Sequence, residues 1–211
     1  MEDNFWHECL KNNQIGFHLP AVNPLLVQHF SSLSVSSQAR IFVPLCGKSS
    51  DISWLLDRGF SVVGVELSVL AINQLFDELK ITPAITTRGA ITRYKGPKID
   101  ILVGDIFKVS QFDLGSVSAT YDRAALVALP AEMRRMYSEH VIDITNAAPQ
   151  LLLTFSYDQK LVDGPPFSIS KDEVFSHYSG HYDCELLQEK AVAGGGLKGT
   201  VPAADNVWLL K

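Results

Sequence analysis

Four residues that could bind a small organic ligand lie at the ends of short apolar segments: Gly47, Glu66, Asp105 and Arg123. Glycine allows a tight turn into a helix, and the first N–H groups of a helix attract polar or negative atoms. A carboxylate about twenty residues beyond such a turn, at the end of the next strand, can accept hydrogen bonds from both hydroxyls of a ribose. The spacing of Gly47 and Glu66 therefore predicts a site for a nucleoside.

The turn around Gly47 disfavours two other classes of nucleotide. It reads PLCGKS over residues 44–49 and has one glycine, whereas the dinucleotide fingerprint has three. The residue five positions before Gly47 is Phe42, so the glycine that opens a phosphate-binding loop is missing. Since no close approach to phosphate is provided for, a nucleoside without phosphates, such as S-adenosylmethionine, fits better than NAD or a nucleoside triphosphate.

The elements that must position these residues alternate between strand and helix. Short runs of apolar, β-branched and aromatic residues predict buried strands at residues 40–46, 62–66, 99–103, 117–121 and 150–155. Helical spacing of apolar residues predicts helices at 49–58, 68–79 and 130–146, and two more strands, 183–192 and 206–210, flank a glycine-rich loop. This alternation predicts an α/β fold with a mostly parallel sheet, helices on both faces and ligands at the carboxyl ends of the strands.

Length and composition suit one globular domain over residues 1–211 that binds a small molecule. The chain is 46% hydrophobic and 19% charged, with a formal net charge of −5 and no run of Lys or Arg, so nucleic acid and anionic membranes are not expected partners. The acidic N-terminus does not resemble a signal or transit peptide, and no apolar stretch approaches the roughly 18 residues of a membrane span. We expect a cytoplasmic monomer, because no long exposed apolar stripe is evident.

The cysteines and histidines predict neither disulfides nor a metal site. Cys9, Cys46 and Cys184 are widely spaced and form no CxxC pair. Cys46 is expected to be buried as a small apolar residue. His177 and His181 are four residues apart, but Gly180 intervenes and no third ligand is evident, so surface histidines are the better interpretation.

Five segments have a recognisable order and spacing: NNQIGFHL near the start, VPLCGKS, VVGVELS, YDRAALVAL, and FSYD followed by GPPF. Together they cover most of the chain and resemble the thiopurine S-methyltransferase family. The resemblance implies a Rossmann-like class I methyltransferase fold, with a seven-stranded, mostly parallel sheet and an antiparallel C-terminal hairpin. It also implies methyl transfer from S-adenosyl-L-methionine, leaving S-adenosyl-L-homocysteine, to an aromatic or heterocyclic thiol such as a thiopurine. Bacterial relatives are associated with the methylation of selenium and tellurium compounds.

The resemblance, together with the glycine turn, assigns roles to individual residues. Cofactor contacts fall on Leu10, Leu45, Gly47, Glu66, Asp105, Ile106 and Arg123. Acceptor contacts fall on Phe17, His18, Pro166 and Phe167, and residues 1–38 are expected to cover the cofactor site. The chain departs from the family at Leu10, where relatives have tryptophan, and in the tail 193–204, which has no arginine.

Arg123 is the candidate catalytic residue. The resemblance places it between cofactor and acceptor, where a guanidinium would attract and position a thiolate. Methyl transfer mainly needs orientation and desolvation, so no dedicated base is required. The alternative for Arg123 is a structural ion pair with Asp122 or another acid. For the whole chain, two other functions stay open: a class I methyltransferase with a different small-molecule acceptor, and a non-catalytic nucleoside-binding module.

Overall fold

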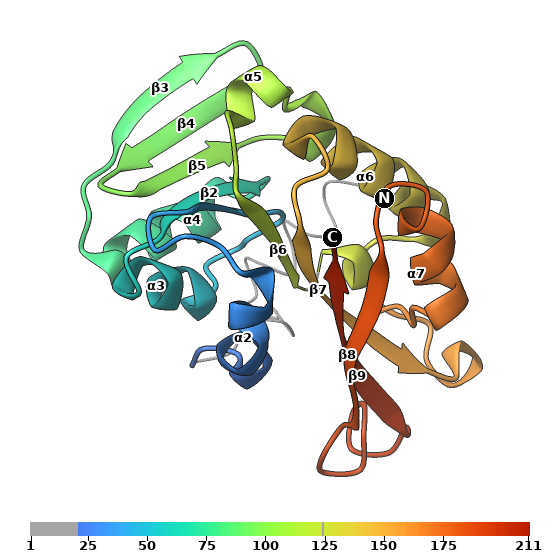
Figure 1. Cartoon of the computed structure of the whole chain (residues 1–211). Coiled ribbons are helices and arrows are strands. Elements are labelled where there is room, and N and C mark those ends of the chain that lie inside the picture. Colours follow the sequence, from blue (N-terminus) through green and yellow to red (C-terminus); the bar gives the residue numbers. More distant parts are fainter. Residues whose placement is uncertain (1–20, 124) are drawn as a thin grey trace.

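A mixed sheet of nine strands forms the centre of the computed structural model, which describes residues 21–123 and 125–211 (Figure 1). Five strands run parallel to one another: β1 (Arg40–Val43), β2 (Ser61–Glu66), β5 (Ile99–Val103), β6 (Ala119–Arg123) and β7 (Gln150–Tyr157). Antiparallel strands flank them: β3 (Ala84–Arg88) and β4 (Ile91–Gly96) at one edge, β8 (Cys184–Ala191) and β9 (Ala203–Leu210) at the other. The spatial order is β3-β4-β5-β2-β1-β6-β7-β9-β8.

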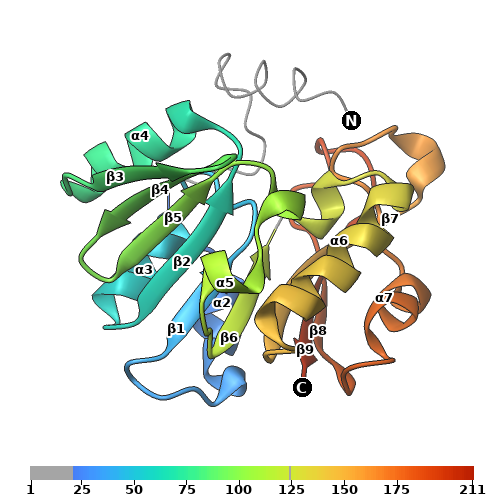
Figure 2. The same cartoon turned by 90° about the horizontal axis from the view of Figure 1, so that it is seen from above.

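Helices cover both faces of this sheet, as Figure 2 shows from above. One face packs against α2 (Pro24–His29), the 3-10 helix η1 (Phe30–Leu33), α3 (Ser50–Asp57) and α4 (Val69–Leu79). The other face packs against α5 (Gln111–Leu114), α6 (Ala131–Thr145) and α7 (Lys171–Tyr178). Two short 3-10 helices pack into the same core: η2 (Ile106–Lys108) follows β5, and η3 (Leu126–Ala128) follows β6. A fourth 3-10 turn, η4 (Gln159–Leu161), follows β7.

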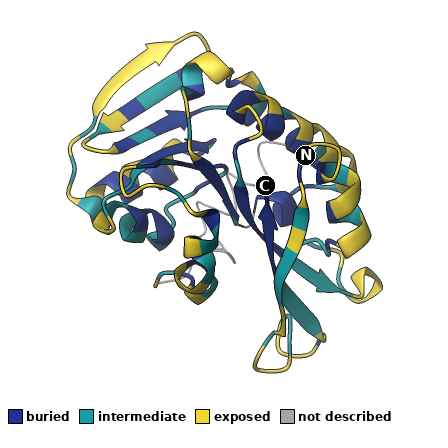
Figure 3. Cartoon of the chain, viewed as in Figure 1, coloured by how far each residue is buried: buried dark blue, intermediate teal, exposed yellow. Residues whose placement is uncertain are grey.

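Burial on both faces explains why β1 and β2 are mostly apolar. In β1, Ile41 and Val43 point into the core on the α3 side, whereas Phe42 points into the core on the α6 side. Alternate residues of a strand face opposite sides, so a strand covered on both sides needs an unbroken apolar run. Figure 3 shows the result as buried central strands beside the exposed strand β3.

The predicted starts and ends of helices are confirmed. Ser49 precedes α3 and its hydroxyl accepts the Asp51 N–H at 3.2 Å, while Ser68 caps α4 by accepting the Ala71 N–H at 3.2 Å. Such caps satisfy N–H groups that the helix itself leaves unpaired. Gly59, with φ +91°, directly follows the last turn of α3, where a left-handed conformation favours glycine.

The prediction of seven strands was wrong in its count. The parallel strands and the antiparallel pair β8–β9 are present as expected, but the hairpin β3–β4 adds two strands beside β5. All five residues of β3 are exposed, so the segment has no buried apolar run from which a strand could be predicted. Helices α2 and α7 were also missed, because with six and eight residues each is too short for a clear helical period. No helix within the described ranges is long and apolar enough to cross a bilayer.

Candidate functional site

The predicted ligand residues lie along one edge of the sheet. Gly47 follows β1, Glu66 ends β2, Asp105 follows β5 and Arg123 ends β6, and these four strands are neighbours in the order β5-β2-β1-β6. All four are parallel, so their carboxyl ends meet at the same edge. The chain proceeds from β1 to β2 on one side and later returns to β6 on the other. This reversal of strand order is where open α/β sheets bind ligands.

The turn after β1 has an unusual backbone. Leu45 and Gly47 both have positive φ, +45° and +51°. A non-glycine residue in this conformation costs on the order of 1 kcal/mol or more, and such strain gathers at ligand sites. The turn is held by the Cys46 N–H, which donates to the Val65 carbonyl oxygen at 3.0 Å. The turn from Leu45 to Gly47 is thereby fixed against the end of β2.

Glu66 has both carboxylate oxygens anchored. Oε2 accepts the Gly47 N–H at 2.8 Å and Oε1 accepts the Ser68 N–H at 2.9 Å. These charge-assisted bonds fix the carboxylate, which is 9% exposed, at the carboxyl edge. Each carboxylate oxygen has two lone pairs and can accept more than one hydrogen bond, as the binding of a ribose hydroxyl would require. The arrangement fits a nucleoside.

Asp105 and Ile106 lie where predicted, but both have structural duties as well. The Asp105 carboxylate accepts the Phe107 N–H at 3.0 Å and so caps η2. The Ile106 side chain is buried, and its carbonyl oxygen is bonded by the His140 ring at 2.8 Å. The short helix η2 is therefore hydrogen-bonded to α6, which fixes its position beside the carboxyl end of β5.

Arg123 forms an ion pair, but not with Asp122. Its Nη1 lies 3.5 Å from Asp51 Oδ2, and its side chain is 15% exposed. Asp122 is the preceding residue of the same strand and so points to the opposite face. There it accepts the Tyr137 hydroxyl at 2.6 Å, and burial raises its pKa to about 6. Arg123 thus pairs with the acid at the start of α3. It also lies near Asp205 on β9, where burial raises the pKa of the carboxyl group and the Arg123 charge acts against that rise.

The segment expected near the acceptor is tied to the turn that follows Arg123. The Phe167 N–H donates to the Val127 carbonyl oxygen at 2.6 Å, and the Arg134 guanidinium lies over the Phe167 ring, 5.7 Å from its centroid. The Tyr157 hydroxyl donates to the Pro166 carbonyl oxygen at 2.5 Å. Pro166 and Phe167 are thereby fastened to β7 and to η3.

Cys46 is unsuited to act as a nucleophile. It is 6% exposed, and burial raises the pKa of its thiol well above its usual range, with the nearby Glu66 charge adding to the effect. The thiol therefore stays protonated at neutral pH and packs as an apolar group. On α7, His177 contacts Glu173 at 3.3 Å. Among residues 21–123 and 125–211, no three His, Cys, Asp or Glu side chains gather as a metal site would require.

Other predicted residues lie outside the described part of the chain: Leu10, Phe17 and His18. Sequence reasoning also missed residues that shape the site. Asp51 is an acid in the first turn of α3, and Arg134 is an arginine within α6. Their partners are far away in sequence, and no local pattern could have identified them.

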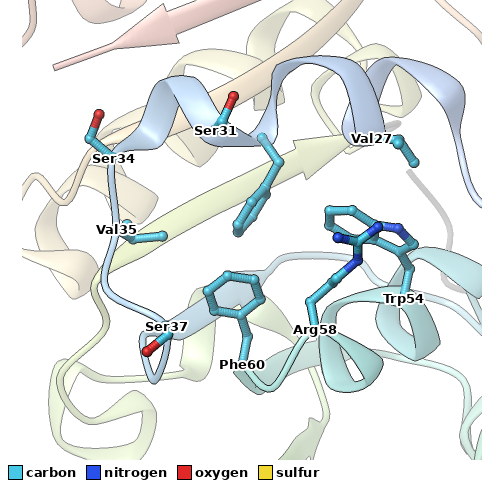
Figure 4. Close-up of a pocket in the computed structure, with 9 residues that line it drawn as sticks. Val27, Ser31, Ser34, Val35, Ser37, Trp54, Arg58 and Phe60 are labelled. Carbon is cyan, nitrogen blue, oxygen red and sulfur yellow. The ribbon is translucent and has the colours of Figure 1, made fainter.

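A separate groove of about 450 Å³ lies between α2, η1 and the end of α3. Figure 4 shows the side chains that line it. Ser37 and Phe60, which help to line it, come shortly before β1 and β2, so the groove lies near the amino ends of these strands. Phe30 and Phe60 form its aromatic floor with 4.8 Å between ring centroids, and the Arg58 guanidinium covers Trp54 at 5.1 Å. The groove is therefore distinct from the edge that holds Glu66 and Arg123.

Known proteins of one family resemble this chain over nearly its whole length. The family model described as Thiopurine S-methyltransferase (TPMT) matches residues 1–209. A protein named thiopurine S-methyltransferase from Xanthobacter autotrophicus is 49% identical over 212 residues, which cover 100% of this chain and 99% of its own. Another of that name, from Acinetobacter baylyi, is 43% identical over 214 residues, which cover 100% and 98%.

Solved structures share the fold. An S-adenosylmethionine-dependent methyltransferase from Methanosarcina mazei matches with a TM-score of 0.63 at 14% identity, over 90% of this chain and 98% of its own. A glycopeptide N-methyltransferase complexed with S-adenosylmethionine matches with a TM-score of 0.58 at 12% identity, over 90% and 95%. At such identities the likeness concerns the fold alone. Sequence and fold together lead to one conclusion: the chain belongs to the thiopurine S-methyltransferase family and is an S-adenosylmethionine-dependent methyltransferase.

Proposed function

We propose that this enzyme transfers the methyl group of S-adenosylmethionine to the sulfur of a small aromatic or heterocyclic thiol, or to a selenium or tellurium compound. One observation carries the proposal: the bond of 2.6 Å between the Phe167 N–H and the Val127 carbonyl oxygen. It brings the segment expected at the acceptor to the turn directly after Arg123. The Phe167 ring and the Arg123 guanidinium would then both face the acceptor. That pairing suits a planar, anionic acceptor.

The cofactor half of the site would be held by residues at the ends of β1, β2 and β5. The anchored Glu66 carboxylate would accept the ribose hydroxyls, Leu45 and Gly47 would shape the turn beside it, and Asp105 and Ile106 would line the adenine. Leu10 belongs to the same proposal on the resemblance alone. When bound, S-adenosylmethionine supplies a methyl group on a positively charged sulfur that leaves as a neutral thioether.

Arg123 is the proposed catalytic residue. A guanidinium stays charged at any pH of interest, and a nearby positive charge favours the ionised form of a thiol. Arg123 would therefore raise the fraction of thiolate at the site and hold it in line with the methyl carbon. Pro166 and Phe167, with Phe17 and His18 on the resemblance alone, would confine the acceptor. Orientation of this kind accounts for much of the rate enhancement available to a simple displacement.

A radiolabelled-methyl assay tests the acceptor. The purified enzyme is offered an aryl thiol, a thiopurine, selenite and a phenol, each with labelled S-adenosylmethionine. We expect labelled product from the thiols and the selenium compound, and little from the phenol, whose conjugate base is scarce at neutral pH. Labelling of the phenol alone would indicate a different acceptor class. Binding of S-adenosylhomocysteine without labelling of any acceptor would indicate a non-catalytic binding module.

The same proposal includes a single methyltransferase domain over residues 1–211 that acts as a cytoplasmic monomer. Large apolar side chains that are exposed in the described ranges come from separate elements, for example Val27 on α2, Ile85 on β3 and Phe175 on α7. Scattered apolar residues of this kind need no partner. Residues 1–38 would cover the cofactor. Light scattering on a sizing column checks the oligomeric state.

A further inference from the structure

One buried carboxylate, that of Asp51, joins three elements around Arg123. Its Oδ1 accepts the Asn23 N–H at 2.7 Å, and its Oδ2 accepts the Tyr121 hydroxyl at 3.0 Å. The same Oδ2 lies 3.5 Å from Nη1 of Arg123. Asp51 belongs to α3, Tyr121 and Arg123 to β6, and Asn23 is the cap residue of α2. A single carboxylate thus connects the start of α2 with the proposed catalytic arginine.

The surroundings of Asp51 are built for a charged group. The side chain is 2% exposed, and burying a carboxylate is costly unless hydrogen bonds and an opposite charge compensate. Two donors and one guanidinium provide that compensation, and the first turn of α3 adds favourable N–H dipoles. Burial, and then the Asp51 charge, raise the pKa of Tyr121 well above its usual range. The Tyr121 hydroxyl therefore stays protonated and remains a donor to Asp51.

The geometry around Oδ2 limits how strongly Asp51 holds the arginine. Direct charge-assisted N–H···O bonds are about 2.7–2.9 Å long, and the pair between Arg123 and Asp51 is longer, at 3.5 Å. Tyr121 donates to the same oxygen and so competes with Arg123 for it. A pair of this length orients the guanidinium, and the Arg123 charge also acts on the Asp205 carboxylate of β9. An acceptor anion would therefore join the carboxylates that already surround Arg123.

We propose that Asp51 is a positioning residue: it sets the direction of the Arg123 guanidinium toward the acceptor anion and couples that direction to the docking of Asn23 at the start of α2. The inference rests on the proposed function of Arg123. Asp51 touches neither cofactor nor acceptor and acts through Arg123. Tyr121 weakens the ion pair between Asp51 and Arg123, because its hydroxyl donates a hydrogen bond to the same oxygen, Oδ2.

The main test compares Asp51→Asn with Asp57→Asn, a matched change at an exposed position of the same helix. For Asp51→Asn we expect kcat/KM for an aryl thiol to fall by about 10- to 100-fold, because a misdirected guanidinium costs orientation. The Kd of S-adenosylhomocysteine should change by less than about threefold, since Glu66 is untouched. Asp57→Asn should match the wild type in both. An Asp51→Asn enzyme with lower stability but unchanged kcat/KM would overturn the inference.

Tyr121→Phe is the second variant, and it keeps the shape of the core if Asp51→Asn fails to fold. Without the hydroxyl, Oδ2 is left to Arg123, the ion pair tightens, and attraction for the acceptor falls. We expect KM for the ionised thiol to rise by about 3- to 10-fold with the Kd of S-adenosylhomocysteine unchanged. Wild-type KM in Tyr121→Phe would contradict the tuning of the pair.

Arg123→Gln, measured in parallel, separates the inference from the function on which it rests. If Arg123→Gln and the Asp51 variant both lose thiol turnover, both claims stand. If Arg123→Gln loses turnover but Asp51→Asn and Tyr121→Phe do not, the positioning role alone is wrong. If Arg123→Gln turns over the thiol at the wild-type rate, the role of Arg123 is wrong, whatever the other variants do.

Discussion

At the scale of single residues, two neighbours in β6 have opposite environments. Arg123 reaches the carboxyl edge and Asp51, while Asp122 points into the core and accepts the Tyr137 hydroxyl. Oδ1 of Asp122 has no hydrogen bond of good geometry among the described residues, although the amides of Ala125 and Leu126 lie close enough to lower its pKa. Desolvation outweighs these contacts, so the pKa of Asp122 rises to about 6.

This shift predicts a pH dependence of stability that Asp122→Asn should remove. Between the ordinary pKa of 3.8 and about 6 the folded state holds the proton more tightly than the unfolded state. The folded state therefore loses stability as pH rises through this window, by at most about 3 kcal/mol. Asparagine cannot ionise, so the free energy of unfolding of the Asp122→Asn protein should not decrease for this reason as pH rises.

Urea unfolding of both proteins from pH 4 to pH 7 measures the effect. The variant should gain stability relative to the wild type as pH rises, with most of the gain complete a little above pH 6. A difference between the two proteins that stays constant over the whole range would show that Asp122 ionises as easily in the folded state as in the unfolded chain.

At the scale of elements, the turn after β1 depends on a glycine in the neighbouring strand. A Cβ built on Gly64 in β2 would lie 2.8 Å from Cys46 Sγ and 2.8 Å from Ile101 Cδ1. Real Cβ atoms do not approach other heavy atoms so closely. Gly64 is therefore the residue that lets the Leu45–Gly47 turn lie against β2 and brings Gly47 to Glu66.

Gly64→Ala should destabilise the protein by about 1–3 kcal/mol, as other overpacked cores are destabilised. Adding Cys46→Ala removes one of the two close contacts and should restore part of the loss. A double-mutant cycle in urea measures the coupling between the two positions. Additive effects, or a Gly64→Ala protein as stable as the wild type, would show that the turn has more room than the structure gives it.

The elements were largely predictable from the sequence, and the contacts between them were not. Buried runs such as Ile99–Val103 and caps such as Ser68 are local signals, and these elements are where they were expected. The exposed strand Ala84–Arg88 has no such signal. The role of Asp51 depends on partners 28 and 70 positions away, so only the assembled fold could reveal it.

At the scale of the whole molecule, the site is a consequence of topology. Strand ends from β5, β2, β1 and β6 are adjacent only because the chain reverses its direction across the sheet after β5. The added hairpin β3–β4 lies at the β5 side of the sheet, and the antiparallel pair β8–β9 lies at the other. Neither addition interrupts the four strands at the centre, so the prediction of the fold is correct for the strands whose carboxyl ends form the candidate site.

The central claim is that this edge holds S-adenosylmethionine through Glu66, and calorimetry with S-adenosylhomocysteine tests it most directly. In Glu66→Gln an amide N–H₂ group replaces one carboxylate oxygen and faces the N–H of either Gly47 or Ser68. Two donors then face each other, so one of the hydrogen bonds that hold the side chain is lost. The acceptor for the ribose hydroxyls is weakened as well. Hydrogen bonds to a charged group contribute about 1.5–3 kcal/mol, which corresponds to a Kd about 10- to 100-fold weaker.

Glu185→Gln is the matched control. Glu185 lies on the outer strand β8, its side chain is 56% exposed, and its carboxylate forms an ion pair with Lys211. We expect tight binding of S-adenosylhomocysteine to the wild type and to Glu185→Gln, and a Kd about 10- to 100-fold weaker in a folded Glu66→Gln protein. Binding of equal strength in Glu66→Gln and the wild type would contradict the central claim.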